Sequence, residues 1–357
     1  MQIGLIGLPS AGKTTLFNAL VKTNAETGGY ASAKAPNRGI IKVPDRRVAL
    51  LSELFQPKKT TYATIEYLDI AGITEGSGKQ EGQQGEGGLS ALRQMDVLVH
   101  VLRGFPDMAG ASVSPESDYE TVMIELALAD LEIVERRLTR LSKELRLKKT
   151  PEYARENELL EQCKSVIESG GAIRDIALTG EDEKLLRGYR FLSQKPCMTV
   201  LNIPEETLGH ESELLKTLEA LPGSTETMAL CAKVEMEIAR LDEADAAVFL
   251  EDLGITEPAL TRMVITSYRL LNLISFFTVG DDEVRAWTIT KGDTAPEAAG
   301  KIHSDLERGF IRAEVAGWQE ILDADGWTGV KDKGLLRLEG KQYTVQDGDV
   351  MNIRFNV

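Results

Sequence analysis

Residues 7–14 read GLPSAGKT, and this loop is the strongest indication of fold in the chain. It matches the pattern G-x-x-x-x-G-K-[ST] of the phosphate-binding loop, in which backbone N–H groups at a helix start surround phosphate oxygens. Such a loop requires a strand before it and a helix after it. Residues 3–6 are apolar and residues 15–20 show helical apolar spacing, so both are present. The sequence therefore predicts a nucleoside triphosphate site, with Lys13 reaching the β- and γ-phosphates and Thr14 binding Mg²⁺.

Composition limits the other classes of function. The 357 residues carry a formal net charge of −15, so a contact with nucleic acid requires a local basic patch. No run approaches the roughly 20 apolar residues that span a bilayer, and there is no signal-peptide pattern. The three cysteines are widely separated, which indicates neither a disulfide framework nor a zinc site. We expect a cytoplasmic protein without a membrane partner.

A local basic patch lies in a helical segment between residues 117 and 192. Apolar residues recur there at alternating steps of three and four, at Leu131, Val134, Leu138, Leu141 and Leu145. Pro151 marks a break, and Leu159, Cys163 and Val166 form a stripe on a return helix. The pattern predicts an inserted antiparallel coiled-coil arm. Its cations are Arg136, Arg137, Arg140, Lys143, Arg146, Lys148 and Lys149. This cluster of cations is compatible with two interpretations, a solvated helix face and a surface that binds polyanions.

The remaining segments predict an α/β domain that continues after the arm and a small α+β module. Apolar runs typical of parallel strands are residues 3–6, 64–69, 97–102, 198–202 and 227–232. Helices are expected at residues 234–253 and 259–271. Short strands follow at 276–279, 284–290, 343–345 and 350–355, with a helix near 295–308. The predicted domains are 1–116 and 193–274 for nucleotide binding, 117–192 for the arm and 275–357 for the module.

A second motif, D-x-x-G at residues 69–72, ends the strand at 64–69. Asp69 can hold Mg²⁺ through water, and the N–H of Gly72 can sense the γ-phosphate. The glycine-rich stretch at residues 74–88 has no apolar face, so we expect a mobile switch loop there. The predicted catalytic residues are Lys13, Asp69 and Gly72.

Ile73 follows this motif, where Ras-type enzymes place a glutamine that orients the attacking water. An isoleucine side chain cannot hydrogen-bond a nucleophile. Either Gln80, Gln83 or Gln84 positions the water, or turnover is slow without a partner.

A third motif reads N-I-P-E at residues 202–205, where guanine-specific enzymes carry N-K-x-D. Glu205 is one methylene longer than aspartate, which disturbs the bidentate fit to guanine. Ile203 stands where a lysine would pack against the base. The motif predicts ATP, or relaxed specificity, rather than GTP, while a conventional GTPase stays an alternative.

In this order the motifs resemble those of the YchF/Obg-like ATPase family, P-loop proteins related to translation factors. The resemblance covers essentially the whole chain, and its further matches are residues 36–39, 44–46, 284–289, 295–303, 309–314 and 347–352. It implies a Ras-like α/β P-loop NTPase with a mostly parallel sheet, an inserted coiled-coil arm and a β-grasp-like TGS domain. It further implies ATP hydrolysis with Mg²⁺ and association with the ribosome or ribosomal RNA through the arm and the TGS-like domain. We expect a monomer.

The resemblance also implies individual contacts. Nucleotide phosphates fall on Pro9, Ser10, Ala11, Gly12, Lys13, Thr14 and Thr15, the metal on Thr14 and Asp69, and the base on Asn202, Ile203 and Glu205. Ser10 replaces the family's asparagine, which helps to hold a monovalent cation in related enzymes, so K⁺ dependence stays open. Residues 30–35 lack the family's switch threonine, and only Ser32 offers an aliphatic hydroxyl. A nucleotide-responsive binding module with negligible hydrolysis is therefore a second interpretation.

Overall fold

The computed structural model describes residues 1–22, 37–70, 73–74, 88–106, 112–147, 150–221 and 226–356. Its contacts divide the chain into two compact units. The first comprises Met1–Ile40 and Glu66–Met263, and the second comprises Ile41–Ile65 and Val264–Val357. Among the described residues, no helix has the length and apolar character needed to cross a membrane.

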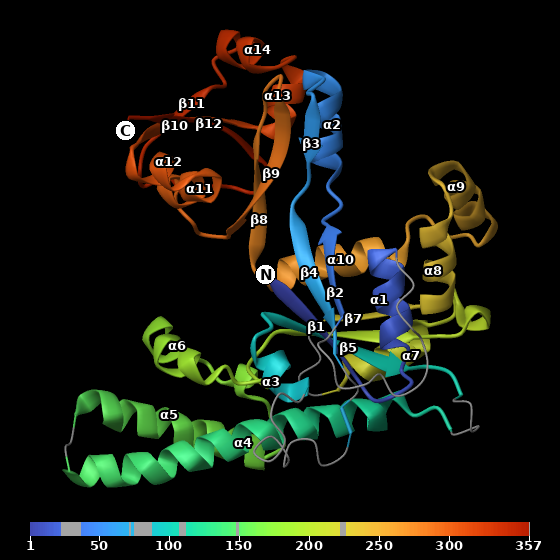
Figure 1. Ribbon diagram of the computed structural model, residues 1–357, viewed down its shortest axis with the longest axis vertical. Helices are drawn as coiled ribbons and strands as arrows, with labels where there is room; N and C mark the ends of the chain where they lie inside the picture. The colour runs from blue at the N-terminus through green and yellow to red at the C-terminus, as the bar shows by residue number, and fades with distance from the viewer. Residues whose placement is uncertain are drawn as a thin grey trace. The chain divides into compact units, whose positions relative to one another are not determined.

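A six-stranded sheet of order β2-β4-β1-β5-β6-β7 forms the centre of the first unit (Figure 1). The strands are β1 (Gln2–Ile6), β2 (Asn37–Lys42), β4 (Thr64–Asp69), β5 (Val97–Arg103), β6 (Cys197–Asn202) and β7 (Glu226–Leu230). β1 pairs in parallel with β4 and β5, and the pairs β5–β6 and β6–β7 are also parallel. Because parallel strands are covered on both faces, they read as the apolar runs seen in the sequence. The predicted α/β P-loop fold class is confirmed.

Helices cover this sheet and build its core. They are α1 (Lys13–Val21), α3 (Gly88–Arg93), α4 (Pro115–Leu147), α7 (Ser212–Glu219), α8 (Ala232–Arg240) and α9 (Glu243–Asp252). The next helix, α10 (Ala259–Leu270), is divided between the two units at Met263. The helix predicted at residues 234–253 is two helices, α8 and α9. The break lies at Asp242, whose side chain accepts a hydrogen bond from the amide of Asp245 and so starts a new helix.

The predicted arm is present as a pair of long helices, α4 and α5 (Pro151–Glu168), which run side by side in Figure 1. The helix α6 (Gly180–Leu186) and the short 3₁₀ turns Ile173–Asp175 and Arg187–Tyr189 complete it. Its core contains Val134, Leu141, Leu159, Leu160, Cys163, Ile167 and Phe191. The stripe on the return helix thus ends on Ile167, whereas the predicted Val166 is only partly buried. The first half of α4 instead packs on the sheet, through Val122, Leu126 and Ala129.

The second unit contains a sheet of order β11-β10-β12-β8-β9-β3. Its strands are β3 (Lys59–Thr61), β8 (Leu273–Thr278), β9 (Glu283–Thr290), β10 (Phe310–Gly317), β11 (Arg337–Glu339) and β12 (Asp349–Phe355). β8–β9 and β10–β12 are antiparallel, whereas β12–β8 and β3–β9 are parallel. Its helices are α2 (Arg46–Phe55), α11 (Ala295–Ile302), α12 (Ser304–Arg308), α13 (Trp318–Asp323) and α14 (Trp327–Asp332).

Two local predictions for this unit were wrong. Residues 343–345 form no strand, and only an isolated bridge joins Thr344 to Thr294. The helix expected at 295–308 is broken at His303, which is extended, with a φ of −163°, and caps α12 by accepting a hydrogen bond from the amide of Asp305. The contacts also group α2 and β3 with the C-terminal module, although the sequence analysis assigned them to residues 1–116.

Candidate nucleotide-binding site

The phosphate-binding loop connects β1 to α1 and adopts backbone conformations that require its glycines. Gly7 and Gly12 have φ values of +145° and +90°. A Cβ on Gly7 would lie 2.3 Å from the carbonyl oxygen of Val101, and one on Gly12 would lie 2.2 Å from Asn202 Nδ2. A side chain at either position is therefore both strained and obstructed. Pro9 and Ser10 are exposed at the tip of the loop, while Thr14 and Thr15 are half-buried at the start of α1.

Lys13 lies inside the loop with only 7% of its surface exposed. Its Nζ donates hydrogen bonds to the carbonyl oxygens of Gly7, at 3.1 Å, and Leu8, at 2.8 Å. Burial lowers the pKa of Lys13 to about 8, and the nearby Asp69 carboxylate partly opposes that effect. The ammonium group is thus poised in the loop, where incoming phosphate oxygens could replace the two carbonyl partners.

Asp69 ends β4 beside this loop. Its Oδ2 accepts a hydrogen bond from Thr14 Oγ1 at 2.9 Å, so the two predicted metal ligands lie in contact. The side chain of Asn37, at the start of β2, approaches the same oxygen at 3.5 Å. The sequence alone predicts no role for Asn37. The P-N-R-G run at residues 36–39 was the available signal, but only the pairing of β2 with β4 places it beside Asp69.

Ile73 turns away from the site. Its amide donates to the carbonyl oxygen of Gly7 at 3.1 Å, and its side chain is 4% exposed in the core cluster beneath the sheet. This position agrees with the expectation that Ile73 does not orient the nucleophile. Gly72, Ser32 and the candidate glutamines Gln80, Gln83 and Gln84 lie outside the described residues.

The third motif connects the phosphate loop to the loop that follows β7. Asn202 Nδ2 donates to the carbonyl oxygen of Ala11 at 3.1 Å, and Asn202 Oδ1 accepts from the amide of Ala232 at 3.0 Å. The Asn202 side chain is buried, and both halves of its amide are used. Asn202 therefore acts first as a brace between two loops, a role that its position in the sequence did not reveal.

The other two residues of this motif differ in exposure. Ile203 is 1% exposed and belongs to a core cluster with Leu102 and Leu218, so its side chain does not face solvent. Glu205 is half-exposed, and one of its carboxylate oxygens lies 3.6 Å from Nζ of Lys233 at the start of α8. The sequence analysis did not pair Lys233 with Glu205, which lies 28 residues earlier in the chain.

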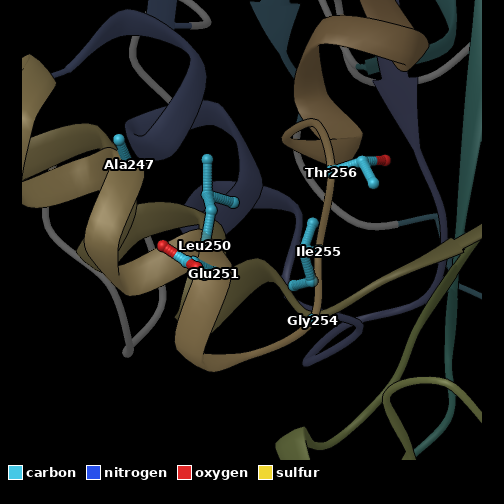
Figure 2. Close-up of a pocket in the computed structure, with 6 residues that line it drawn as sticks. All are labelled: Ala247, Leu250, Glu251, Gly254, Ile255 and Thr256. Atoms are coloured by element: carbon cyan, nitrogen blue, oxygen red, sulfur yellow. The ribbon is translucent and has the colours of Figure 1, made fainter.

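A cavity of about 440 Å³ lies away from these motifs, between α9 and the turn that follows it (Figure 2). Figure 2 shows Leu250 on α9 and Ile255 in the turn, with Glu251 beside them. None of the predicted site residues lines this cavity.

The fold and the loop geometry define a nucleotide-binding protein of the P-loop class. A family model described as "50S ribosome-binding GTPase" matches residues 2–143, and the YchF-GTPase_C model, described as "protein of unknown function", matches residues 273–356. The chain is 45% identical to the ribosome-binding ATPase YchF of Bacillus subtilis (strain 168), across 100% of both chains. It belongs to the YchF family.

Two further relatives agree with this assignment. The ribosome-binding ATPase YchF of Escherichia coli O157:H7 is 40% identical over 100% of this chain and 99% of its own. The solved structure of the Schizosaccharomyces pombe YchF GTPase superposes with a TM-score of 0.85 at 27% identity, covering 99% of this chain and 97% of that one. The resemblance inferred from the motifs is thereby confirmed.

Proposed function

We propose that this chain is an ATPase that binds ATP with Mg²⁺, hydrolyses it slowly and associates with the ribosome in the cytoplasm. The observation that carries this proposal is the convergence of Lys13, Thr14 and Asp69 at one end of the parallel sheet. Full-length relatives at 35–45% identity carry the name ribosome-binding ATPase, which supports both the reaction and the partner.

The residues at this site fit a magnesium ion. The hydroxyl of Thr14 and the carboxylate of Asp69 are hard oxygen donors, which Mg²⁺ prefers, and phosphate oxygens and water would complete its shell. When bound, the ion would neutralise part of the phosphate charge. Thr14 and Asp69 would hold it, and Thr14 would then exchange its hydrogen bond to Asp69 for metal coordination.

The chain acts on the reaction by positioning and by charge stabilisation. The Lys13 ammonium would leave the two loop carbonyls and bind the β- and γ-phosphate oxygens. The amides at the start of α1 have no helical acceptors, so they can donate to the same phosphates. The Gly72 amide is the proposed sensor of the γ-phosphate. Because Ile73 is apolar and buried, either Gln80, Gln83 or Gln84 positions the water or turnover is slow without a partner, and we propose slow turnover.

We base the preference for ATP on Glu205 and Ile203, which stand where guanine-specific enzymes carry the aspartate and the lysine of N-K-x-D. The Glu205 carboxylate lies beside Lys233 rather than in a fixed bidentate position, which favours adenine or relaxed specificity. Calorimetric titration with Mg²⁺-ATP and Mg²⁺-GTP tests this preference, and GTP binding tenfold tighter than ATP would contradict it. The same titration in K⁺ and in Na⁺ decides whether Ser10 leaves a monovalent cation effect.

A binding module with negligible hydrolysis is the second candidate, favoured by the burial of Ile73. Multiple-turnover phosphate release, measured with and without ribosomes, separates the two. A partner-activated ATPase accelerates when ribosomes are added, whereas a passive module does not.

We propose that the arm binds ribosomal RNA through cations on α4. Arg136, Arg140, Lys143 and Arg146 are exposed and follow one another at steps of three and four. Arg137, in contrast, points into the arm and pairs with Glu156. Reversing the charge of Arg136, Arg140 and Lys143 should weaken co-sedimentation with ribosomes, most strongly at low salt. Unchanged co-sedimentation would remove the arm from this account.

Residues 275–357, which form most of the second unit, are the candidate TGS-like domain. Its mixed sheet packs on α11 through Phe276, Ala298, Phe310 and Val315, an arrangement compatible with a β-grasp-like module. We propose that it adds a second contact to the ribosome and that the protein acts as a monomer. The domain boundaries at 116/117, 192/193 and 274/275 are part of this proposal, with residues 41–65 grouped with the C-terminal module rather than with the nucleotide-binding domain.

A further inference from the structure

Both ends of the arm meet the C-terminal end of α3 in a polar cluster, which we call the arm junction. It consists of Arg93 on α3, Asp130 on α4, and Arg190, Ser193 and Lys195 on the segment that returns from the arm to β6. The residues come from three separate parts of the chain, so the junction exists only in the folded protein.

Asp130 is the centre of the arm junction and is fully buried. Its Oδ1 accepts from Arg93 Nη1 at 2.8 Å and from the amide of Leu192 at 2.9 Å. Its Oδ2 accepts from the amide of Ser193 at 2.7 Å and from the Ser193 hydroxyl at 2.8 Å. One carboxylate therefore joins α3, the outgoing helix and the returning segment. Removing the Arg93 partner of so buried a charge is costly.

The end of α3 is held from both sides. Arg93 also donates to the carbonyl oxygens of Ala129, at 3.1 Å, and Arg190, at 3.3 Å. Lys195 Nζ donates to the carbonyl oxygen of Arg93 at 3.1 Å, and Arg190 hydrogen-bonds Gln94. Cations at the last carbonyls of a helix satisfy groups that the helix itself leaves free. A shift of α3 would thus move both ends of the arm.

The apolar residues of α3 share a core cluster with a residue beside the phosphate loop. Leu89 and Leu92 pack in the same core cluster as Ile73, the residue after the D-x-x-G motif. Ile73 is in turn hydrogen-bonded to Gly7 at the start of the phosphate loop. Val122 and Leu126 of α4 belong to the same cluster. Within the described residues, Leu89 and Leu92 of α3, Ile73 beside the phosphate loop and the base of α4 thus belong to one apolar cluster.

We infer that α3 and the arm junction couple the nucleotide state of the phosphate site to the arm, with Arg93 and Asp130 as the residues that transmit the change. This inference rests on the proposed function, because it takes the bound nucleotide as the input. Coupling free energies are reciprocal, so a partner that binds the arm would change the affinity for nucleotide by the same factor.

A junction that only holds the arm in place would behave differently. It would protect the amides of Leu192 and Ser193 equally in every nucleotide state, because their acceptor Asp130 would not move. Hydrogen exchange of these two amides therefore separates a coupling role from a merely structural one.

The experiment measures amide hydrogen exchange of the full chain, without nucleotide and saturated with a non-hydrolysable ATP analogue and Mg²⁺. In the wild-type protein we expect exchange at Leu192 and Ser193 to change by about fivefold or more between the two states, the lower range of allosteric coupling. In Arg93→Gln the change should fall below about twofold, in keeping with a lost coupling. Lys164→Gln is the matched control, since it removes a cation and its ion pair with Glu135 within the arm, away from the junction.

Two further measurements keep the outcome decisive. Calorimetry on the same samples shows whether nucleotide binds. If Arg93→Gln does not fold, Arg93→Lys replaces it, because lysine keeps the charge but lacks the planar guanidinium group. A folded variant that retains the full change overturns the inference. A wild-type protein that binds nucleotide without any change at the junction also overturns it and leaves the proposed function intact. A wild-type protein that binds no nucleotide contradicts the proposed function itself.

Discussion

Lys13 shows how one buried side chain can be prepared for a polyanionic ligand. In the free protein two main-chain oxygens hold its ammonium group, and burial lowers the pKa of Lys13 to about 8. A bound triphosphate would supply stronger, charged partners and raise that pKa again. ATP binding should therefore be accompanied by proton uptake near pH 8.

We expect the affinity for ATP to fall as the pH rises. Between pH 7 and pH 9 the protonated fraction of Lys13 in the free protein drops about tenfold, so the Kd for Mg²⁺-ATP should rise by about the same factor. Calorimetry at both pH values, in two buffers of different ionisation enthalpy, measures the affinity and the proton uptake. Lys13→Met should bind weakly at both pH values, and a wild-type Kd that does not change would contradict the assignment.

His100 also has a displaced pKa. It lies on β5 with no exposed surface, stacks on Tyr119 at 5.4 Å between ring centroids, and its ring nitrogens have no hydrogen-bond partner among the described residues. Burial, with lesser effects of the Lys13 and Arg174 charges, lowers the pKa of His100 to about 3. It is therefore a neutral core residue at physiological pH.

His100 should make the protein less stable in acid. Below about pH 6.5 the unfolded chain binds a proton at His100 that the folded chain does not bind. The contribution of His100 to the free energy of unfolding is therefore fully present above that pH and is lost progressively toward pH 3. Between pH 7.5 and pH 5.5 the loss from this residue is on the order of 1 kcal/mol. Urea unfolding at both pH values measures it, and His100→Phe should show a correspondingly smaller change. Equal pH dependence in the two proteins would rule out this role.

At the scale of elements, the arm is stabilised by a polar network as well as by its apolar core. Arg137 on α4 donates to Glu156 on α5 at 2.8 Å, to Glu144 at 3.2 Å and to the hydroxyl of Tyr189 at 3.2 Å. Tyr189 stacks on Phe191 in the arm core. One guanidinium group thus joins three segments, and the Glu156 hydrogen bond is the main reason that the pKa of Arg137 is raised.

Loss of this network should loosen the arm. We expect Arg137→Met to lower the free energy of unfolding by about 1–2 kcal/mol, because charged hydrogen bonds across the helix pair are lost. Arg136→Met removes only an exposed pair with Glu132 one turn away and should cost about 0.5 kcal/mol or less. Chemical denaturation of the two variants provides the test. Equal effects would show that the inward network does not stabilise the arm.

At the scale of the whole molecule, the second unit is assembled from two distant segments. Arg47 on α2 pairs with Asp45 at 2.8 Å and with Asp347 at 2.9 Å, and its guanidinium lies 5.0 Å from the ring centroid of Phe277 on β8. These contacts, with the pairing of β3 to β9, attach residues 41–65 to the C-terminal module. The chain thus leaves the nucleotide-binding sheet and returns to it before the arm begins.

Arg47→Met should release this early segment. We expect a loss of about 2 kcal/mol, the range of a hydrogen bond to a charged group, and faster exchange of the amides in α2 and β3. The adjacent Arg46 is exposed, so Arg46→Met is the control and should leave exchange unchanged. Hydrogen exchange of residues 46–61 measures both variants. Full protection in Arg47→Met would show that β3 pairing alone holds the segment.

Local patterns predicted much of the fold because they were long or carried several constraints at once. The strand expected at residues 64–69 has those bounds, and both arm helices follow their apolar repeats. The helix expected at 234–253 failed because a cap at Asp242 interrupts an otherwise helical pattern. The strands β2, β3, β10 and β11 were missed, since their pairing depends on neighbours distant in sequence.

In the candidate site, too, the sequence predicted the residues that belong to motifs and missed the contacts between distant segments. Lys13, Thr14 and Asp69 were predicted because each belongs to a short motif whose spacing follows from phosphate and metal chemistry. The brace made by Asn202, the approach of Asn37 to Asp69 and the pairing of Glu205 with Lys233 join residues that no motif connects. Sequence spacing contains no information on such contacts.

The sequence by itself determined the P-loop class, the parallel α/β sheet, the inserted arm and the preference for ATP that we propose. These follow from local motifs and periodicities, which backbone and side-chain chemistry fix over a few residues. Only the tertiary structure decided that residues 41–65 join the C-terminal module and that Asp130 ties both ends of the arm to α3. Such contacts form between distant segments, so burial and packing of the whole chain decide them.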